Sequence, residues 1–168
     1  MRRPYCGAMP RLFVAVRPPG DALDALVALP RPPIPGLRWI DPRRLHVTMR
    51  FLGDADEEAA LAALGGERFP VAGVTLGPGV ERLGRGVLVV PAAGLEDLAT
   101  AIAAATARIG QPPPDRPFVG HVTVARYRGT PPAGYAPPIR ATFTATEIAL
   151  VCSDPPGTYR NVATFALH

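Results

Sequence analysis

The sequence predicts an α+β fold with two similar lobes of mostly antiparallel strands and flanking helices, arranged around a central cleft. Short apolar segments alternate with alanine- and leucine-rich helical segments in both halves of the chain. Each half contains one copy of the tetrad His-Val-Thr-hydrophobic, beginning at His46 and His121. Proline clusters keep the connections short, and no linker separates independent domains. We therefore expect one bilobal domain over residues 1–168, with residues 1–10 as a loose leader.

The first half is expected to contain two strands and two helices. The segment "RLFVAV" (residues 11–16) is apolar and stopped by prolines, which favours a buried strand. In "DALDALVALP", Asp21 is the expected N-cap of a helix. "LHVTMRFLG" predicts a strand closed by Gly53, and "DADEEAALAALGG" predicts a helix with an acidic first turn and a glycine end.

The second half is also expected to contain strands and a helix, although outside the duplicated tetrad the two halves are not alike in sequence. "VAGVTLG" and "VLVVP" predict strands joined by the turn-rich "GVERLGRG". A long helix is expected from about residue 94 to 109, because leucine and isoleucine recur there at core-facing spacing and Gly110 follows. Three more strands are predicted from "HVTVARY", "ATFTATEIALVC" and "YRNVATFAL", which are rich in β-branched and aromatic residues.

Composition restricts the class of protein more than it identifies a partner. The net charge is +4, and all 18 basic residues are arginine, as in a GC-rich genome, so an anionic partner is favoured only weakly. Cys6 and Cys152 are too few for a disulfide framework. The apolar run near the N-terminus is too short for a signal peptide or a membrane span. We expect a cytoplasmic monomer with no membrane partner.

The duplicated tetrad points to a shared chemical role. On a strand, side chains two residues apart project from one face, so His46 pairs with Thr48 and His121 with Thr123. If the lobes face each other, two imidazoles and two hydroxyls converge on one cleft. One imidazole can accept a proton from water while the other protonates a leaving oxygen, and the hydroxyls can donate to phosphoryl oxygens. This set suits metal-independent displacement at phosphorus, for which a cyclic phosphodiester is a natural substrate.

Simpler interpretations exist for each part of the pattern. A single tetrad is ordinary β-alternation, and one histidine on a strand is more often structural; the duplication favours a common function. Zinc binding would need a third ligand, and no cysteine or acidic residue has a ligand-like spacing from the two histidines. We expect no metal and no organic cofactor, and we place the terminal His168 outside the site.

These motifs resemble those of the two-histidine phosphoesterases, in particular the LigT-like RNA 2′,3′-cyclic phosphodiesterases of bacteria and archaea. The resemblance covers most of the chain: "RLFVAVRPP" resembles the opening strand, "LRWIDPRRLHVTMRFLGD" and "FVGHVTVAR" the two motifs, and "YRNVATFAL" the closing strand. Met49 stands where leucine is usual, and Val119-Gly120 replaces a common proline. The resemblance implies two similar lobes around a cleft and no metal requirement.

The resemblance also implies roles for five residues. It assigns acid–base catalysis to His46 and His121, and substrate phosphate binding to Thr48, Thr123 and Arg126. It implies a substrate that is RNA or a nucleotide with a 2′,3′-cyclic phosphate end.

The alternation of side chains along each strand indicates which other residues face the cleft. Strict alternation from His121 would send Arg126 to the opposite face, so its role requires a bulge, and a surface arginine is the alternative. Arg50 has the parity of the first motif and is expected to border the cleft. Phe13 or Trp39 could stack a base at the rim, although such aromatics more often belong to the core.

The motifs and the resemblance together predict hydrolysis of a 2′,3′-cyclic phosphate, and the resemblance implies that the product is a 2′-phosphate. His46 is assigned as the acid that protonates the departing 3′-oxygen and His121 as the base that activates water, although the sequence alone permits the reverse. Two alternatives stay open. One is a related phosphodiesterase acting on 2′,5′-linked oligonucleotides or an ADP-ribose cyclic phosphate, and the other is a non-catalytic nucleotide- or RNA-binding module.

Overall fold

The computed structural model describes residues 11–154 and 157–168, so the leader expected at residues 1–10, with Cys6, lies outside the described residues. The elements in chain order are β1 (Arg11–Val16), α1 (Gly20–Val27), β2 (Leu37–Trp39), the 3-10 turn η1 (Pro42–Arg44), β3 (Val47–Asp54), α2 (Glu57–Gly65), β4 (Ala72–Leu76), β5 (Glu81–Leu83), β6 (Val87–Ala93), α3 (Glu96–Ala105), β7 (His121–Tyr127), β8 (Ala141–Ala145), β9 (Glu147–Asp154) and β10 (Thr158–Ala166).

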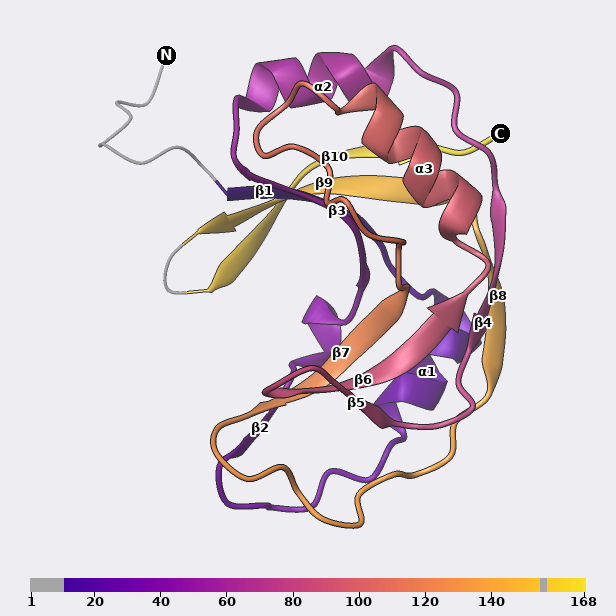
Figure 1. Cartoon of the computed structure of the whole chain (residues 1–168). Helices are drawn as coiled ribbons and strands as arrows, with labels where there is room; N and C mark the ends of the chain where they lie inside the picture. Colours follow the sequence, from indigo (N-terminus) through magenta and orange to yellow (C-terminus); the bar gives the residue numbers. More distant parts are fainter. Residues whose placement is uncertain (1–10, 155–156) are drawn as a thin grey trace.

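The strands form one strongly curved sheet in the order β10-β9-β1-β3-β7-β6-β4-β8, with β2 added to β7 and β5 to β6 (Figure 1). Every pairing is antiparallel. We call the strands β10, β9, β1 and β3 the first lobe. The second lobe consists of β7, β6, β4 and β8, together with β2 and β5. The α+β class with mostly antiparallel strands is confirmed.

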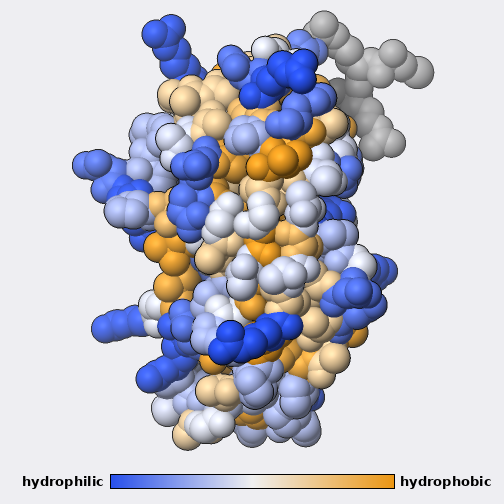
Figure 2. Space-filling model, turned by 90° about the vertical axis from the view of Figure 1, so that its right-hand side faces the viewer, coloured by the Kyte–Doolittle hydropathy of each residue, from blue (hydrophilic) through white to orange (hydrophobic). Residues whose placement is uncertain are grey.

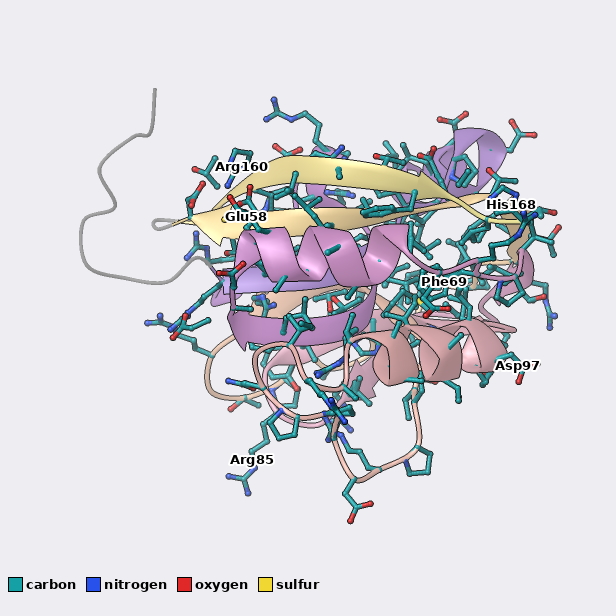
Figure 3. All side chains as sticks on the ribbon, turned by 90° about the horizontal axis from the view of Figure 1, so that it is seen from above. Glu58, Phe69, Arg85, Asp97, Arg160 and His168 are labelled. Atoms are coloured by element: carbon teal, nitrogen blue, oxygen red, sulfur yellow. The ribbon has the colours of Figure 1, made fainter. Side chains whose placement is uncertain are left out.

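The helices cross between the lobes. α1 follows β1 of the first lobe but packs against β8 of the second, whereas α3 follows β6 of the second lobe and packs against β3 of the first. α2 packs against both α3 and β10, and the three elements lie beside one another when seen from above (Figure 3). Each lobe is therefore packed against a helix that follows a strand of the other lobe.

The far edge of the second lobe shows why these strands form. In β4, Ala72, Val74 and Leu76 are buried, while Gly73 and Thr75 between them are exposed beside the exposed threonines of β8. This alternation is typical of a sheet with one face on the core. Figure 2 shows this side of the molecule, where pale, weakly polar residues occupy the middle between charged groups.

Two details differ from the sequence-based expectations. "ATFTATEIALVC" is not one strand: the chain leaves β8 of the second lobe and enters β9 of the first at Thr146. No glycine or proline occurs at this crossing, and threonine fits the interior of a strand as well as its end. The sequence therefore gives no signal for the break. Helix α1 begins at Gly20 with Pro19 in the N-cap position, two residues earlier than expected, so Asp21 lies in its first turn rather than at its N-cap. None of the described helices has the length and apolar character needed to cross a membrane.

Candidate active site

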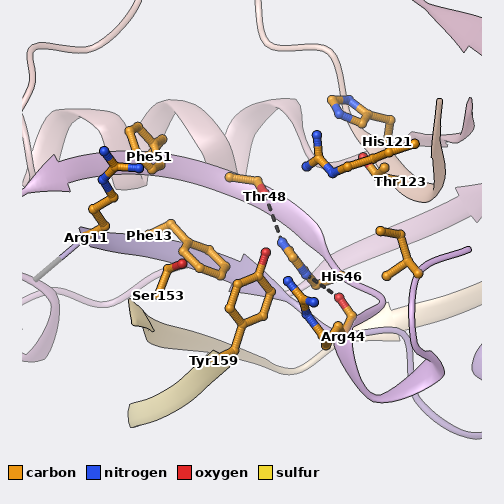
Figure 4. A pocket seen from close by; sticks show the side chains of 12 residues that line it. Arg11, Phe13, Arg44, His46, Thr48, Phe51, His121, Thr123, Ser153 and Tyr159 are labelled. Atoms are coloured by element: carbon orange, nitrogen blue, oxygen red, sulfur yellow. Dashed lines mark hydrogen bonds between the residues drawn. The ribbon is translucent and has the colours of Figure 1, made fainter. Parts of the chain in front are cut away.

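The two lobes meet at the duplicated motifs. Strands β3 and β7 are joined by one antiparallel pair, Val47 with Val122, which are the middle residues of the two His-Val-Thr sequences. Continuing that register sets each histidine across from the threonine of the other strand, on the face opposite the two buried valines. His46, Thr48, His121 and Thr123 accordingly line one cleft of about 250 Å³ (Figure 4). The four predicted residues are thus brought together by a single bridge.

Strand β3 carries a bulge directly after its motif threonine. Consecutive residues of β1 pair with Thr48 and Arg50, which leaves Met49 as the extra residue. Met49 and Arg50 are both buried, so alternation shifts by one position beyond them. Phe51 therefore returns to the cleft, with 46% of its surface exposed.

Strand β7 carries the same bulge at the same place. Consecutive residues of β6 pair with Thr123 and Ala125, so Val124 is the extra residue, and Val124 and Ala125 are both buried. Arg126 is exposed and lines the cleft. This is the bulge that the sequence required for Arg126 to share a face with His121.

Arg50 does not border the cleft, and the expectation from simple alternation is wrong because of the bulge at Met49. Its side chain is 4% exposed and points into the protein. One guanidinium nitrogen donates to the carbonyl of Phe51 at 2.6 Å, and another donates to the carbonyl of Gln111. The Gln111 amide in turn donates to the Leu52 carbonyl at 2.8 Å. Arg50 thus fastens the segment after α3 to the strand that carries the first motif.

Both catalytic candidates are anchored in the same way through Nδ1. His46 Nδ1 lies 2.6 Å from the carbonyl of Arg44, and His121 Nδ1 lies 2.8 Å from the carbonyl of Val119. A carbonyl only accepts, so Nδ1 carries the proton in each neutral ring and Nε2 is left for the cleft. His46 Nε2 then accepts from the Thr48 hydroxyl at 3.1 Å.

Gly120 fixes the start of β7. Its carbonyl accepts from the Ala92 amide at 2.9 Å, and a Cβ at this position would collide with the Ala92 carbonyl. Glycine in place of a proline here permits a close approach of two backbones. The approach fixes the strand immediately before His121.

The two imidazoles differ in their surroundings. The His46 ring stacks on Phe13 at 5.0 Å between centroids and contacts the edge of Tyr159 at 5.7 Å. Burial among these groups lowers the pKa of His46, and the charges of Arg17, Arg44 and His121 lower it further, partly opposed by the hydrogen bond to the Arg44 carbonyl. At neutral pH His46 therefore favours the neutral form.

The aromatic residues at the rim are not the ones the sequence suggested. Phe13 lines the cleft but is 5% exposed and packs on His46. Trp39 lies elsewhere, against Tyr135, with its ring nitrogen donating to the Pro32 carbonyl. Phe51 is the open aromatic surface. The only sequence signal for it is its position five residues after His46, which matches that of Arg126 after the second histidine.

The cleft has a strongly positive lining. Arg11, Arg44 and Arg126 contribute to it, and among the described residues no aspartate or glutamate does. Arg11 lies 3.9 Å from Asp54 at the surface. In residues 11–154 and 157–168 no group of three His, Cys, Asp or Glu side chains that could hold a metal ion is found. Such a lining suits an anionic ligand.

Solved structures with this architecture are known. The chain is similar to TT0787 of Thermus thermophilus, with a TM-score of 0.77, 28% identity, and coverage of 94% of this chain and 97% of that one. It is similar to Escherichia coli LigT complexed with 3′-AMP, with a TM-score of 0.76, 26% identity, and coverage of 94% and 98%. A further phosphoesterase structure gives a TM-score of 0.73 and 29% identity, with coverage of 95% and 98%.

Other structures of E. coli LigT, complexed with NADP⁺, phosphate or ATP, are also similar to this chain. No protein-family model matches the sequence, and no curated protein matches it significantly. The structural similarity extends over nearly the whole of each chain. It confirms the resemblance predicted from the motifs, and it supports a phosphoesterase.

Proposed function

We propose, on the premise that this chain is a LigT-like protein of the two-histidine phosphoesterase superfamily, that it hydrolyses 2′,3′-cyclic phosphate ends of RNA or nucleotides to 2′-phosphates. The observation that carries the proposal is the convergence of His46, Thr48, His121 and Thr123 on one cleft whose described lining has no carboxylate. Two imidazoles and two hydroxyls supply the proton transfers and the oxygen contacts that ring opening at phosphorus needs.

The proposed reaction is an in-line displacement. His121 Nε2 takes a proton from water as the water oxygen bonds to phosphorus. The bond from phosphorus to the 3′-oxygen breaks, and His46 Nε2 delivers its proton to that oxygen, which leaves the phosphate on the 2′-oxygen. Burial lowers the pKa of His46, so its imidazolium releases a proton readily. In this proposal the negative charge of the bound substrate favours protonation of the ring, which can then act as the acid. The Nδ1 anchors hold both rings in orientation.

The remaining cleft residues bind the substrate in this proposal. The hydroxyls of Thr48 and Thr123 and the guanidinium of Arg126 donate to the non-bridging phosphate oxygens, where charge increases in the transition state. Phe51, exposed at the rim, offers a face on which a base can stack. Complexes of LigT with 3′-AMP and with phosphate favour a nucleotide phosphate as the ligand class.

We also propose that the lobes form one domain. α1 and α3 each pack on the lobe from which their preceding strand does not come, so neither lobe has a complete helical cover without the other.

The test is hydrolysis of a nucleoside 2′,3′-cyclic phosphate and a cyclic-phosphate-ended oligonucleotide, in EDTA, with phosphorus NMR to locate the phosphate. We expect turnover to a 2′-phosphate by the wild type, and a loss of about 10²–10⁴-fold in His46→Ala and in His121→Ala. His168→Ala is the matched control, because His168 lies at the C-terminus outside the cleft, and it should retain full activity.

Three outcomes would contradict the proposal. Activity retained by either cleft variant would remove the two-histidine mechanism. Loss of activity in EDTA that zinc restores would favour metal chemistry. Turnover of a 2′,5′-linked dinucleotide or an ADP-ribose cyclic phosphate in preference to the 2′,3′-cyclic substrates would transfer the same mechanism to another diester.

A further inference from the structure

Tyr159 lines the active-site cleft, but the reaction proposed above gives it no role. It lies in β10, more than 100 residues after the first motif, and it reaches that motif because β10 pairs with β9 in the first lobe. Its side chain is half-buried. Tyr159 is therefore a residue of the cleft whose function the two histidine motifs do not explain.

Three neighbours fix the ring of Tyr159. The Phe13 ring lies 5.2 Å away and the His46 ring 5.7 Å away, measured between centroids, at interplanar angles of 68° and 72°. The Arg44 guanidinium lies 4.2 Å from the centroid of the Tyr159 ring, which is a cation–π contact. Because these contacts already hold the ring in place, a ligand that bonds to its hydroxyl loses little affinity to ordering of the side chain.

The hydroxyl of Tyr159 is open to the cleft. Figure 4 shows it directed toward the space beside Thr48 and the His46 ring. In the described part of the chain no protein group forms a hydrogen bond with it. It is not sealed inside the protein either, since the buried side-chain atoms without a partner there belong to Arg44 and Arg50. An accessible phenol without a protein partner can form a hydrogen bond with a ligand in the cleft.

The chemistry of the first motif indicates which hydrogen bond a ligand needs there. Thr48 has one hydroxyl proton, and it donates this proton to His46 Nε2 at 3.1 Å as long as the ring is neutral. It cannot donate to a ligand at the same time. The second lobe brings both the Thr123 hydroxyl and the Arg126 guanidinium to the cleft. On the His46 side, the Tyr159 hydroxyl can supply the donor that Thr48 withholds.

We infer that the Tyr159 hydroxyl binds the substrate phosphate, by donating a hydrogen bond to a non-bridging oxygen on the His46 side of the cleft. The inference rests on the proposed function and deepens it by adding a further substrate-binding residue. Once His46 has protonated the 3′-oxygen, its ring is neutral and Thr48 again donates to Nε2. Tyr159 then donates to the newly formed 2′-phosphate, which carries more negative charge than the cyclic diester.

The kinetic test is Tyr159→Phe, which removes the hydroxyl and keeps the ring against Phe13, His46 and Arg44. We expect kcat/KM for a nucleoside 2′,3′-cyclic phosphate to fall about 10–100-fold, as for the loss of one hydrogen bond to a charged group. The pH at which log(kcat/KM) breaks should not change, because the surroundings of the His46 ring are kept. A break that moves would show that the phenol acts through His46, and it would overturn the inference.

Tyr127→Phe is the matched control. Tyr127 is also half-buried and lies at the end of β7, but it does not line the cleft. This variant should keep the wild-type kcat/KM. Equal losses in the two variants would show a general effect of removing a phenol hydroxyl, and they would overturn the inference.

Calorimetry tests the phosphate contact without the reaction. Inorganic phosphate and 2′-AMP should each bind about tenfold more weakly to Tyr159→Phe than to the wild type. Adenosine, which has no phosphate, should have the same affinity for both proteins. A loss of affinity for 2′-AMP alone, or for adenosine as well, would mean that the hydroxyl contacts the nucleoside, and it would overturn the inference.

The two experiments also separate this inference from the proposed function. If the wild type hydrolyses no cyclic phosphate but binds inorganic phosphate through Tyr159, the proposed function fails and the phosphate contact stands. If the wild type hydrolyses the cyclic phosphate and Tyr159→Phe is equally active, the proposed function stands and the inference is overturned. Affinity for inorganic phosphate that is absent, or that does not depend on Tyr159, also overturns it.

Discussion

Strands β3 and β7 share a series of backbone features but carry different side chains at some of the corresponding positions. Each has a histidine anchored through Nδ1 to the carbonyl two residues earlier, a threonine two residues later, and a bulge at the following residue. The fourth residue after the histidine is buried in both strands, as Arg50 and as Ala125. The fifth returns to the cleft in both, as Phe51 and as Arg126.

The difference between the strands matches the asymmetry of a nucleotide. A phosphate has oxygens on both sides and can use two equivalent imidazoles and hydroxyls, whereas the base lies on one side only. The first strand contributes an aromatic face and the second a guanidinium at equivalent positions. In the proposed function, the repeated residues form the reaction centre, and the two different residues at the fifth position recognise the substrate.

The largest effect is expected from the second strand. Arg126→Ala should lower kcat/KM about 10²–10³-fold, mainly through kcat, because in the proposed mechanism the guanidinium contacts oxygens that gain charge in the transition state. Steady-state kinetics on the cyclic-phosphate dinucleotide measures this. Arg38→Ala is the control, since Arg38 is the β2 partner of Arg126 in the sheet but lines no part of the cleft. Equal effects of the two variants would show that only general charge matters.

The next largest effect is expected at the fourth residue after the histidine, which is Arg50 in β3 and Ala125 in β7. Arg50→Ala should lower the free energy of unfolding by about 2–4 kcal/mol, because it leaves the carbonyls of Phe51 and Gln111 without their donor and opens a cavity. Urea denaturation followed by circular dichroism measures it. The control Arg85→Ala, at an exposed turn, should stay within about 0.5 kcal/mol of the wild type. Unchanged stability of Arg50→Ala would mean that water replaces the guanidinium.

A smaller effect is expected at the fifth position of the first strand. Phe51→Ala should raise KM for the cyclic nucleotide by a factor that corresponds to about 1–3 kcal/mol of lost stacking, with kcat nearly unchanged. Phe51→Tyr should keep the wild-type KM. Val71→Ala serves as the control, because Val71 is about as exposed but lines no part of the cleft. A fall in kcat with KM unchanged would instead place Phe51 at the reacting atoms.

The comparison of the strands also marks the limit of sequence-based reasoning. The convergence of His46 and His121 could be predicted, because a period of two fixes the motif side chains on one face. The bulge at Met49 could not, since this residue does not differ from an ordinary strand residue, and a bulge after His121 followed only from the role that the resemblance implies for Arg126, with nothing in the sequence to locate it at Val124. Simple alternation therefore predicts Arg50 at the cleft and gives no indication of Phe51. Tyr159 and Arg44 surround His46 only after the chain has folded, and no local pattern indicates that contact.

The smallest predicted effect concerns the unequal burial of the two imidazoles. Burial, followed by nearby positive charge, lowers the pKa of His46, so one break in the plot of log(kcat/KM) against pH should lie below the ordinary value of about 6.5. Arg17→Gln removes one of the opposing charges, which stabilises the imidazolium and raises the pKa of His46. That break should move to higher pH in Arg17→Gln and stay in place in Arg85→Gln. A break that does not move would mean that the arginine charge is screened from the ring, and the asymmetry of the two histidines would then rest on burial by Phe13 and Tyr159 alone, whereas a break that moves downwards would contradict its assignment to His46.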